Sequence, residues 1–96
     1  MGGFMTDEEA KINEKIKRLN RVSGQIEGIK KMVADNRGNT EILMQLRAVR
    51  AAVKGMEISL LTDLLRDKAL RMTSISAQKR TEQVEEMVTL MRRYGE

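Results

Sequence analysis

Apolar residues recur along most of the chain at intervals of three and four, the spacing of one face of an α-helix. The first series is Ile12, Ile16, Leu19, Val22, Ile26, Ile29 and Val33. A T-x-x-E capping box begins at Thr6, ahead of this series, and the stretch from Asn36 to Gly38 interrupts the pattern after it. We therefore predict a first helix from Asp7 to Ala34, preceded by a flexible tail over residues 1–6.

A second series predicts another long helix. Its members are Ile42, Leu46, Val49, Val53, Met56, Leu60 and Leu64, with Leu43, Leu61 and Leu65 widening the face. Asn39 or Thr40 can cap its start, and we expect it to run to about Arg66 or Arg71. Residues 72–76 are rich in hydroxyls and form the next break. The apolar positions of a shorter third helix are Val84, Met87, Val88 and Met91. The predicted fold is all-α, a three-helix protomer with two long helices.

The length of the first two helices predicts assembly. Each spans about 40 Å at 1.5 Å per residue, whereas a compact chain of this size has a radius of gyration of about 13 Å. We therefore expect a second copy to complete the apolar faces, in a homodimer or higher symmetric oligomer. Gly24 and Gly28 each cost about 1 kcal/mol in a helix relative to Ala, which favours the close approach of another backbone. A monomeric bundle with frayed ends is the alternative.

The net charge of +4 is unevenly distributed along the chain. Residues 11–54 carry eleven Lys and Arg against four acids, whereas residues 55–96 are balanced and residues 1–10 carry only acids. A concentrated positive charge favours a polyanionic partner. Single-stranded RNA is disfavoured because its bases stack on aromatic side chains, and the chain has only Phe4 and Tyr94. Duplex DNA is therefore the predicted partner.

The basic residues form a stripe beside the apolar face of each long helix. The stripe on the first helix is Lys11, Lys15, Arg18, Arg21 and Gln25, and that on the second is Arg47, Arg50 and Lys54. The alternative is an ordinary solvated face, but few acids are interleaved at i+4, as they would be on a merely solubilising surface.

The composition excludes several chemistries. The 96 residues contain no Cys and no His, which leaves no disulfide, thiolate zinc site or imidazole catalysis. Eight methionines could offer thioethers to Cu(I), but Met56, Met87 and Met91 lie at core spacing. We predict a single domain over residues 1–96, with no metal, no cofactor and no enzymatic activity. No stretch is apolar enough to span a membrane, and the first residues lack the basic and apolar pattern of a signal peptide, so we expect the protein to be cytoplasmic.

Two blocks of sequence resemble the CsoR/RcnR/FrmR family of bacterial repressors. They run from Ile16 to Met32, with the motif R-L-x-R-x-x-G-Q-x-x-G-I, and from Ile42 to Ala52. The resemblance covers about residues 10–94 and implies a disc-shaped dimer of dimers that binds operator DNA through a basic surface. It places four residues at the family's DNA-facing positions, Arg18, Arg21, Gln25 and Arg50, with Lys15, Arg47 and Lys54 nearby.

The chain departs from this family at the sensor. Typical members place a Cys at the start of the second helix, and a His and a Cys four residues apart near its end. Those positions hold Asn39, Leu64 and Lys68 here, which puts the inherited metal and thiol chemistry in doubt. Because Lys68 replaces a thiolate and Arg71 lies three residues on, we expect this pocket to accept a small anionic effector, or none. The alternative is a degenerate pocket, with Lys68 in solvent and Leu64 in the core.

The leading interpretation is therefore a DNA-binding transcriptional repressor with a non-metal effector or none. The competing interpretation is an architectural or scaffolding helical oligomer that binds DNA nonspecifically and senses nothing. An enzyme ranks last, because acids such as Glu57, Asp63 and Asp67 form no paired carboxylate site.

Overall fold

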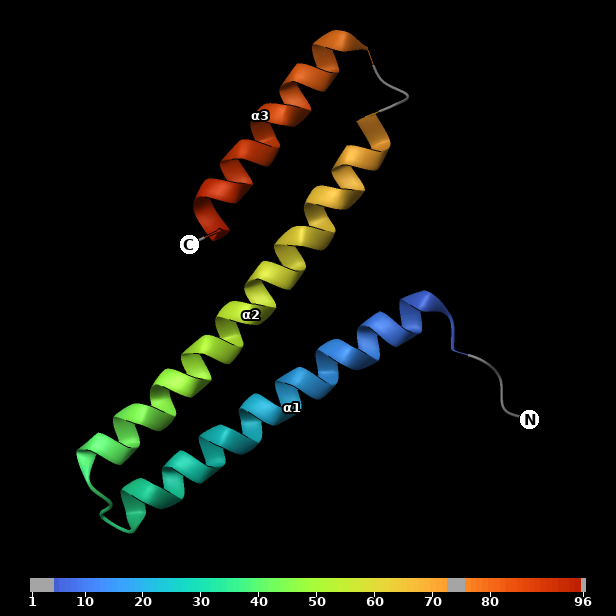
Figure 1. The fold of residues 1–96 in the computed structure, drawn as a ribbon. Coiled ribbons are helices and arrows are strands. Elements are labelled where there is room, and N and C mark those ends of the chain that lie inside the picture. The colour runs from blue at the N-terminus through green and yellow to red at the C-terminus, as the bar shows by residue number, and fades with distance from the viewer. Residues whose placement is uncertain (1–4, 73–75, 96) are drawn as a thin grey trace. The chain divides into compact units, whose positions relative to one another are not determined.

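The computed structural model describes residues 5–72 and 76–95, and this part of the chain consists of three α-helices and no strand (Figure 1). The helices are α1 (Asp7–Ala34), α2 (Asn39–Arg71) and α3 (Ala77–Tyr94). The all-α prediction is confirmed, and α2 ends at the later of the two expected residues. Most of the expected tail, residues 1–4, and residues 73–75 of the expected break lie outside the described residues.

The start of α1 has the local chemistry that the capping box predicts. The hydroxyl of Thr6 accepts a hydrogen bond from the backbone N–H of Glu9 at 3.1 Å, and three acids occupy the first turn. The carboxylates lie near the positive end of the helix dipole, which stabilises the terminus. Ser76 caps α3 in the same way, accepting from the N–H of Lys79 at 3.3 Å. The sequence pattern places Ser76 only within a break and does not predict this cap.

A left-handed residue ends α1 and turns the chain into α2. Asn36 has a φ of 55°, and it is the only non-glycine residue with positive φ in the part of the chain that the structure describes. Its N–H donates to the carbonyl of Val33, and the N–H of Arg37 donates to that of Met32. This pair of bonds is a Schellman motif, which satisfies carbonyls that the helix end leaves without partners.

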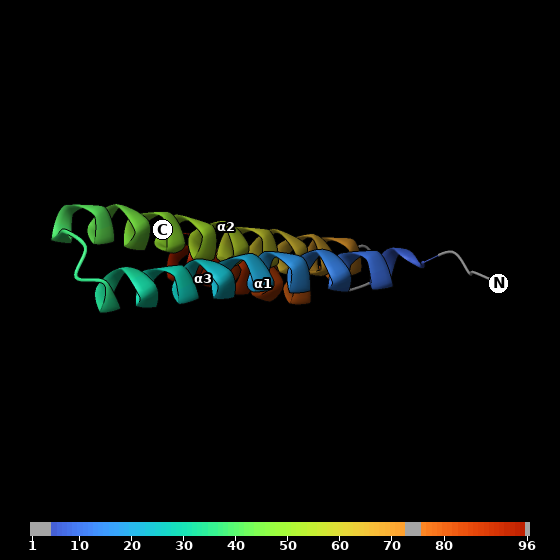
Figure 2. The same cartoon turned by 90° about the horizontal axis from the view of Figure 1, so that it is seen from below.

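The chain forms two compact units. The N-terminal unit extends to Lys54 and holds α1 with the first part of α2, and the C-terminal unit begins at Gly55 and holds the rest of α2 with α3. In the N-terminal unit, α1 and α2 run antiparallel from their connecting turn (Figures 1 and 2). None of the described helices is both long and apolar enough to cross a membrane.

Little of the apolar surface is buried within one chain. Among the described residues, only Val22, Ile29 and Leu61 are buried hydrophobic residues. Most other members of the two long series stay exposed, and Leu43 and Leu46 are 64% and 47% exposed. A Cβ added at Gly24 or Gly28 would meet no atom of the described residues within 4 Å, so one chain offers no reason for these glycines. The expected homo-oligomer stays a prediction.

The left-handed turn gives a stability prediction. We expect Asn36→Val to lower the free energy of unfolding by about 1–2 kcal/mol, because a β-branched residue is strained at positive φ. Asn36→Gly relieves that strain and should leave stability unchanged or slightly raised. Thermal denaturation followed by circular dichroism measures both changes. Equal melting temperatures for the Val and Gly variants would contradict the assigned turn.

Candidate nucleic-acid interface and sensor positions

All seven residues predicted to bind DNA lie in the N-terminal unit. Lys15, Arg18, Arg21 and Gln25 lie on α1, and Arg47, Arg50 and Lys54 lie on the first part of α2. The antiparallel packing of these two helices therefore brings residues from both basic stripes into one compact unit. The α2 residues fall within two turns of helix, because they are spaced by three and four.

The side chains in this set differ in how far solvent reaches them. Arg21, Arg47 and Arg50 are exposed, whereas Lys15, Arg18, Gln25 and Lys54 are half-buried. Arg18 and Gln25 share a helix face with the buried residues Val22 and Ile29, because the four positions follow one another at intervals of three and four. They therefore lie on the packed face of α1, whereas the sequence pattern placed them in a stripe beside the apolar face.

Gln25 carries a buried polar atom without a partner among the described residues. Its amide oxygen Oε1 is buried and accepts no hydrogen bond from the described residues. An unpaired buried acceptor costs about 1–3 kcal/mol, so this oxygen requires a donor from outside the described protomer or a rearrangement of its neighbours. The exposed arginines are the members of the set that a phosphate reaches most readily.

The four arginines predicted to bind DNA have no acidic partner among the described residues. Within the described residues, Arg18, Arg21, Arg47 and Arg50 form no ion pair and no side-chain hydrogen bond. Two other cations of the same unit are paired: Arg37 with Glu41 at 2.9 Å and Lys30 with Glu27 at 3.4 Å. Arginines without carboxylate partners can give all their donors to an external anion.

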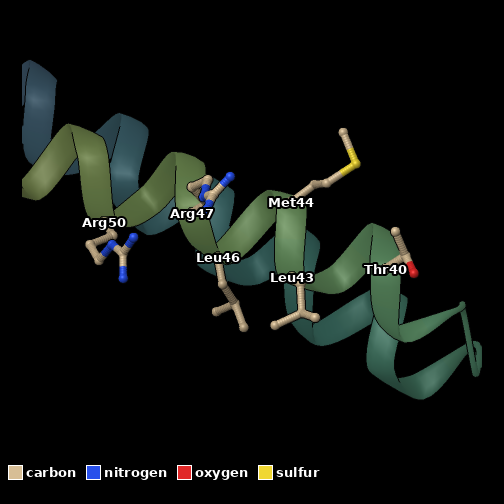
Figure 3. A pocket seen from close by; sticks show the side chains of 6 residues that line it. All are labelled: Thr40, Leu43, Met44, Leu46, Arg47 and Arg50. Atoms are coloured by element: carbon tan, nitrogen blue, oxygen red, sulfur yellow. The ribbon is translucent and has the colours of Figure 1, made fainter.

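Two of these arginines border a hollow on the surface of α2. The hollow has a volume of about 450 Å³, and its six lining residues all come from α2: Thr40, Leu43, Met44, Leu46, Arg47 and Arg50. Figure 3 shows Leu43 and Leu46 on the same side of the helix, with Arg47 and Arg50 further along it from Thr40. Cationic and exposed apolar side chains therefore adjoin one another here.

The expected sensor residues belong to different units of the chain. Asn39, the first residue of α2, lies in the N-terminal unit, whereas Leu64 and Lys68 lie in the C-terminal unit. Leu64 and Lys68 line a common cavity of about 630 Å³ in the C-terminal unit.

The lining of this cavity is mainly acidic, whereas we expected a positively charged pocket around Lys68. The ammonium Nζ of Lys68 pairs with the carboxylate Oε2 of Glu86 on α3 at 2.9 Å, and the Lys68 side chain is only 25% exposed. Glu82 and Glu85 also line the cavity, whereas Arg71 is not among its lining residues. Three carboxylates against one ammonium give an acidic lining, because α3 supplies acids that the pattern on α2 could not reveal.

The alternative interpretation, a degenerate pocket with Lys68 in solvent and Leu64 in the core, does not match the structure of the protomer either. Leu64 stays 41% exposed and so does not join the core of the protomer. Lys68 is engaged with Glu86 and does not simply project into solvent. The described residues also contain no group of three or more His, Cys, Asp or Glu that could hold a metal ion.

Known transcriptional repressors are similar to part of the chain. It is 46% identical to the copper-sensing transcriptional repressor CsoR of Bacillus subtilis (strain 168) over 46 residues, which are 48% of this chain and 46% of CsoR. It is 37% identical to the copper-sensing transcriptional repressor RicR of Mycobacterium tuberculosis (strain ATCC 25618 / H37Rv) over 49 residues, 51% of each protein. The chain thus spans about half the length of these two curated relatives.

The fold also has a solved counterpart. The structure of the nickel-responsive transcriptional regulator InrS superposes with a TM-score of 0.75, covers 98% of each chain and is 24% identical in sequence. At this identity the likeness concerns the fold alone. The family model for metal-sensitive transcriptional repressors matches residues 11–93, nearly the whole chain. The protein therefore belongs to the family of metal-sensitive transcriptional repressors.

Proposed function

We propose that this protein is a DNA-binding transcriptional repressor that works as a homo-oligomer and whose DNA affinity does not respond to Cu(I) or Ni(II). The family consists of transcriptional regulators and not of enzymes. The observation that carries the proposal is the set of arginines on α1 and α2 of the N-terminal unit that have no acidic partner in the described part of the chain.

The chemistry of this surface suits the DNA backbone. A guanidinium is planar and always charged, and it binds two phosphate oxygens at once. Contacts of this kind neutralise phosphates and release counterions, so they supply affinity that falls with salt concentration. They position a protein on the duplex, whereas sequence preference needs contacts to base edges or a preference for DNA shape. We assign Arg21, Arg47 and Arg50 to phosphate contact, with Arg18, Lys15 and Lys54 supporting the same potential.

Assembly into a homo-oligomer, a dimer of dimers, accounts for the surface that one chain leaves exposed. Exposed apolar residues follow one another along both long helices, and contiguous apolar surface of this kind is typical of a protein interface. The open space at Gly24 and Gly28 would admit another backbone closely. Oligomerisation would also place several basic surfaces on one particle, which raises the affinity for duplex DNA through multivalent contact.

The residues at the expected sensor positions do not suit a copper or nickel ion. CsoR and RicR are described as copper-sensing, and InrS as nickel-responsive. Here an amide, an aliphatic side chain and an ammonium already paired with Glu86 stand at Asn39, Leu64 and Lys68. Soft and borderline metals are bound most strongly by thiolate and imidazole donors, which the 96 residues lack. The acidic cavity beside Lys68 likewise argues against the small anionic effector that the sequence suggested.

The competing function, an architectural oligomer that binds any DNA, gains no support from the comparisons. It differs from the proposal in one measurable property, the preference for a particular operator sequence. The DNA titrations below therefore include a shuffled duplex.

The first expected outcome concerns the arginines. We expect Arg21→Ala and Arg47→Ala each to weaken binding to the promoter beside the gene, and to reduce the salt slope of log Kd by about one for each phosphate that is no longer neutralised. Arg80→Ala is the matched control, because it removes an exposed arginine from α3. Fluorescence anisotropy at several salt concentrations measures the slope. An unchanged slope in both variants of the N-terminal unit would contradict the proposed surface, and equal affinity for the shuffled duplex would favour the architectural function.

The second expected outcome concerns mass. Light scattering on a sizing column should give two or four times the protomer mass of 10.9 kDa at micromolar concentration. The physical reason is the apolar surface left exposed on both long helices. A single peak at the protomer mass would exclude the homo-oligomer.

The third expected outcome concerns metals. Stoichiometric Cu(I), Ni(II) or Zn(II) should leave the Kd for DNA unchanged, because the chain has no thiolate or imidazole to bind them. The triple variant Asn39→Cys, Leu64→His, Lys68→Cys is the positive control and should gain Cu(I) binding. Release of the unmodified protein from DNA by one equivalent of any of these metals would contradict the proposal.

A further inference from the structure

Three methionines of the described chain are exposed to solvent, and they differ in degree. Met5, Met44 and Met91 are 58%, 66% and 54% exposed. The other described methionines are half-buried: Met32, Met56, Met72 and Met87. Because the 96 residues contain no Cys, thioethers are the sulfur groups that an oxidant can attack. Met44 therefore carries the most accessible oxidisable sulfur among the described residues.

Met44 lies on the polar side of α2, beside a predicted DNA contact. It belongs to neither apolar series of the long helices, and it precedes Arg47 by three residues within the N-terminal unit. Residues three apart on a helix are neighbours, with Cβ atoms about 5–6 Å apart. Figure 3 shows the side chains of Met44 and Arg47 on one side of α2, opposite to those of Leu43 and Leu46. This thioether therefore has no place among the leucines.

The arginines beside Met44 are not engaged by acids. Met44 lines the hollow of about 450 Å³ together with Arg47 and Arg50. Neither arginine forms an ion pair or a side-chain hydrogen bond within the described residues. Glu41, one turn before Met44, pairs instead with Arg37 at 2.9 Å. An oxygen added to the sulfur would therefore find guanidinium donors that no carboxylate of the described chain occupies.

We propose that Met44 is an oxidation site, and that its conversion to methionine sulfoxide by a peroxide lowers the affinity of the protein for DNA. The effect on DNA rests on the proposed function, whereas the modification itself does not. The site gives a chain without thiols a way to respond to a chemical oxidant, because methionine sulfoxide is reduced back to methionine by dedicated reductases.

The reaction is a two-electron oxygen transfer. A lone pair of Met44 Sδ attacks one oxygen of hydrogen peroxide, so that an S–O bond forms as the O–O bond breaks. The sulfur gives up two electrons, and the second oxygen leaves as hydroxide, which takes the proton of the transferred oxygen and becomes water. Negative charge develops on the leaving oxygen, and an N–H of Arg47 is within one turn of helix to donate to it. This donor favours oxidation of Met44 over a methionine without a neighbouring cation.

The product changes the surroundings of Arg47. A thioether is only a weak hydrogen-bond acceptor, whereas oxidation makes the Met44 side chain polar and gives it an oxygen that accepts hydrogen bonds. Arg47 can donate to this oxygen, and a guanidinium engaged in this way has fewer donors for a DNA phosphate. Because Met44 is exposed, the added oxygen displaces no core contact of the described chain. We therefore expect weaker DNA binding with the helices intact.

The other two exposed methionines lack this combination of features. The sulfur of Met5 accepts a hydrogen bond from Nδ2 of Asn13 at 2.8 Å. Met91 lies on α3 in the C-terminal unit, which contains none of the residues predicted to bind DNA. No Lys or Arg lies three or four residues from Met91 in the sequence. Met91 is therefore an internal reference, an exposed thioether without a cation one turn away.

Treatment of the full chain with hydrogen peroxide tests the site. Peptide mass spectrometry should show Met44 gaining one oxygen atom faster than Met91. Fluorescence anisotropy should show the Kd for promoter DNA rising by about threefold to tenfold, the effect of losing about one hydrogen bond. Met44→Leu removes the sulfur, so its Kd should be the same before and after peroxide. Met91→Leu is the matched control and should keep the full response. Met44→Gln places an amide oxygen near Arg47 and should raise the Kd without any oxidant.

Several results would overturn the inference. Oxidation of Met44 no faster than that of Met91 would do so, as would a Met44→Leu variant that still loses DNA affinity in peroxide. Recovery of the original Kd after treatment with methionine sulfoxide reductases of both epimer specificities counts in its favour, and a Kd that stays high counts against it. Circular dichroism checks that the helices remain. If the unmodified protein does not bind DNA, the proposed function fails, and the rates of oxidation at Met44 and Met91 alone decide whether the modification site stands.

Discussion

Two long amphipathic helices in a chain of 96 residues impose the main constraint on this protein, because they carry more apolar surface than the protomer covers. Burial of apolar area is the main source of folding free energy, at about 25 cal/mol per Å². Most members of the two apolar series remain exposed in the single chain. The fold is therefore a set of well-formed helices whose tertiary stabilisation depends largely on what packs against them.

The helices themselves were predictable because their signals are local. The capping box at Thr6 and the periodic face fix α1 at Asp7–Ala34, and the structure has the same bounds. The break after α1 was recognised from composition, but the positive φ of Asn36 and the two bonds that close the turn required coordinates. Ser76 was missed as a cap because no strong apolar periodicity begins directly after it.

The candidate site was less predictable, because it depends on contacts between residues distant in sequence. Periodicity identified the basic residues of α1 and α2, but it could not show that Arg18 and Gln25 share the packed face of α1. The ion pair between Lys68 and Glu86 joins positions 18 residues apart on different helices, and it reverses the charge expected for the neighbouring cavity. A Lys at a position where typical members of the family place a metal-binding Cys predicts a cationic site only if no acid from another helix reaches it.

The small number of buried residues has a consequence for the life of the protein in the cell. Val22, Ile29 and Leu61 are the buried hydrophobic residues of the described chain, so few segments of a lone protomer are protected from local opening. Opened segments are the substrates of proteases, and binding of the folded state by another copy suppresses them by mass action. Proteolysis would then remove single copies faster than assembled ones. The amount of protein in the cell would therefore rise more than in proportion to its rate of synthesis.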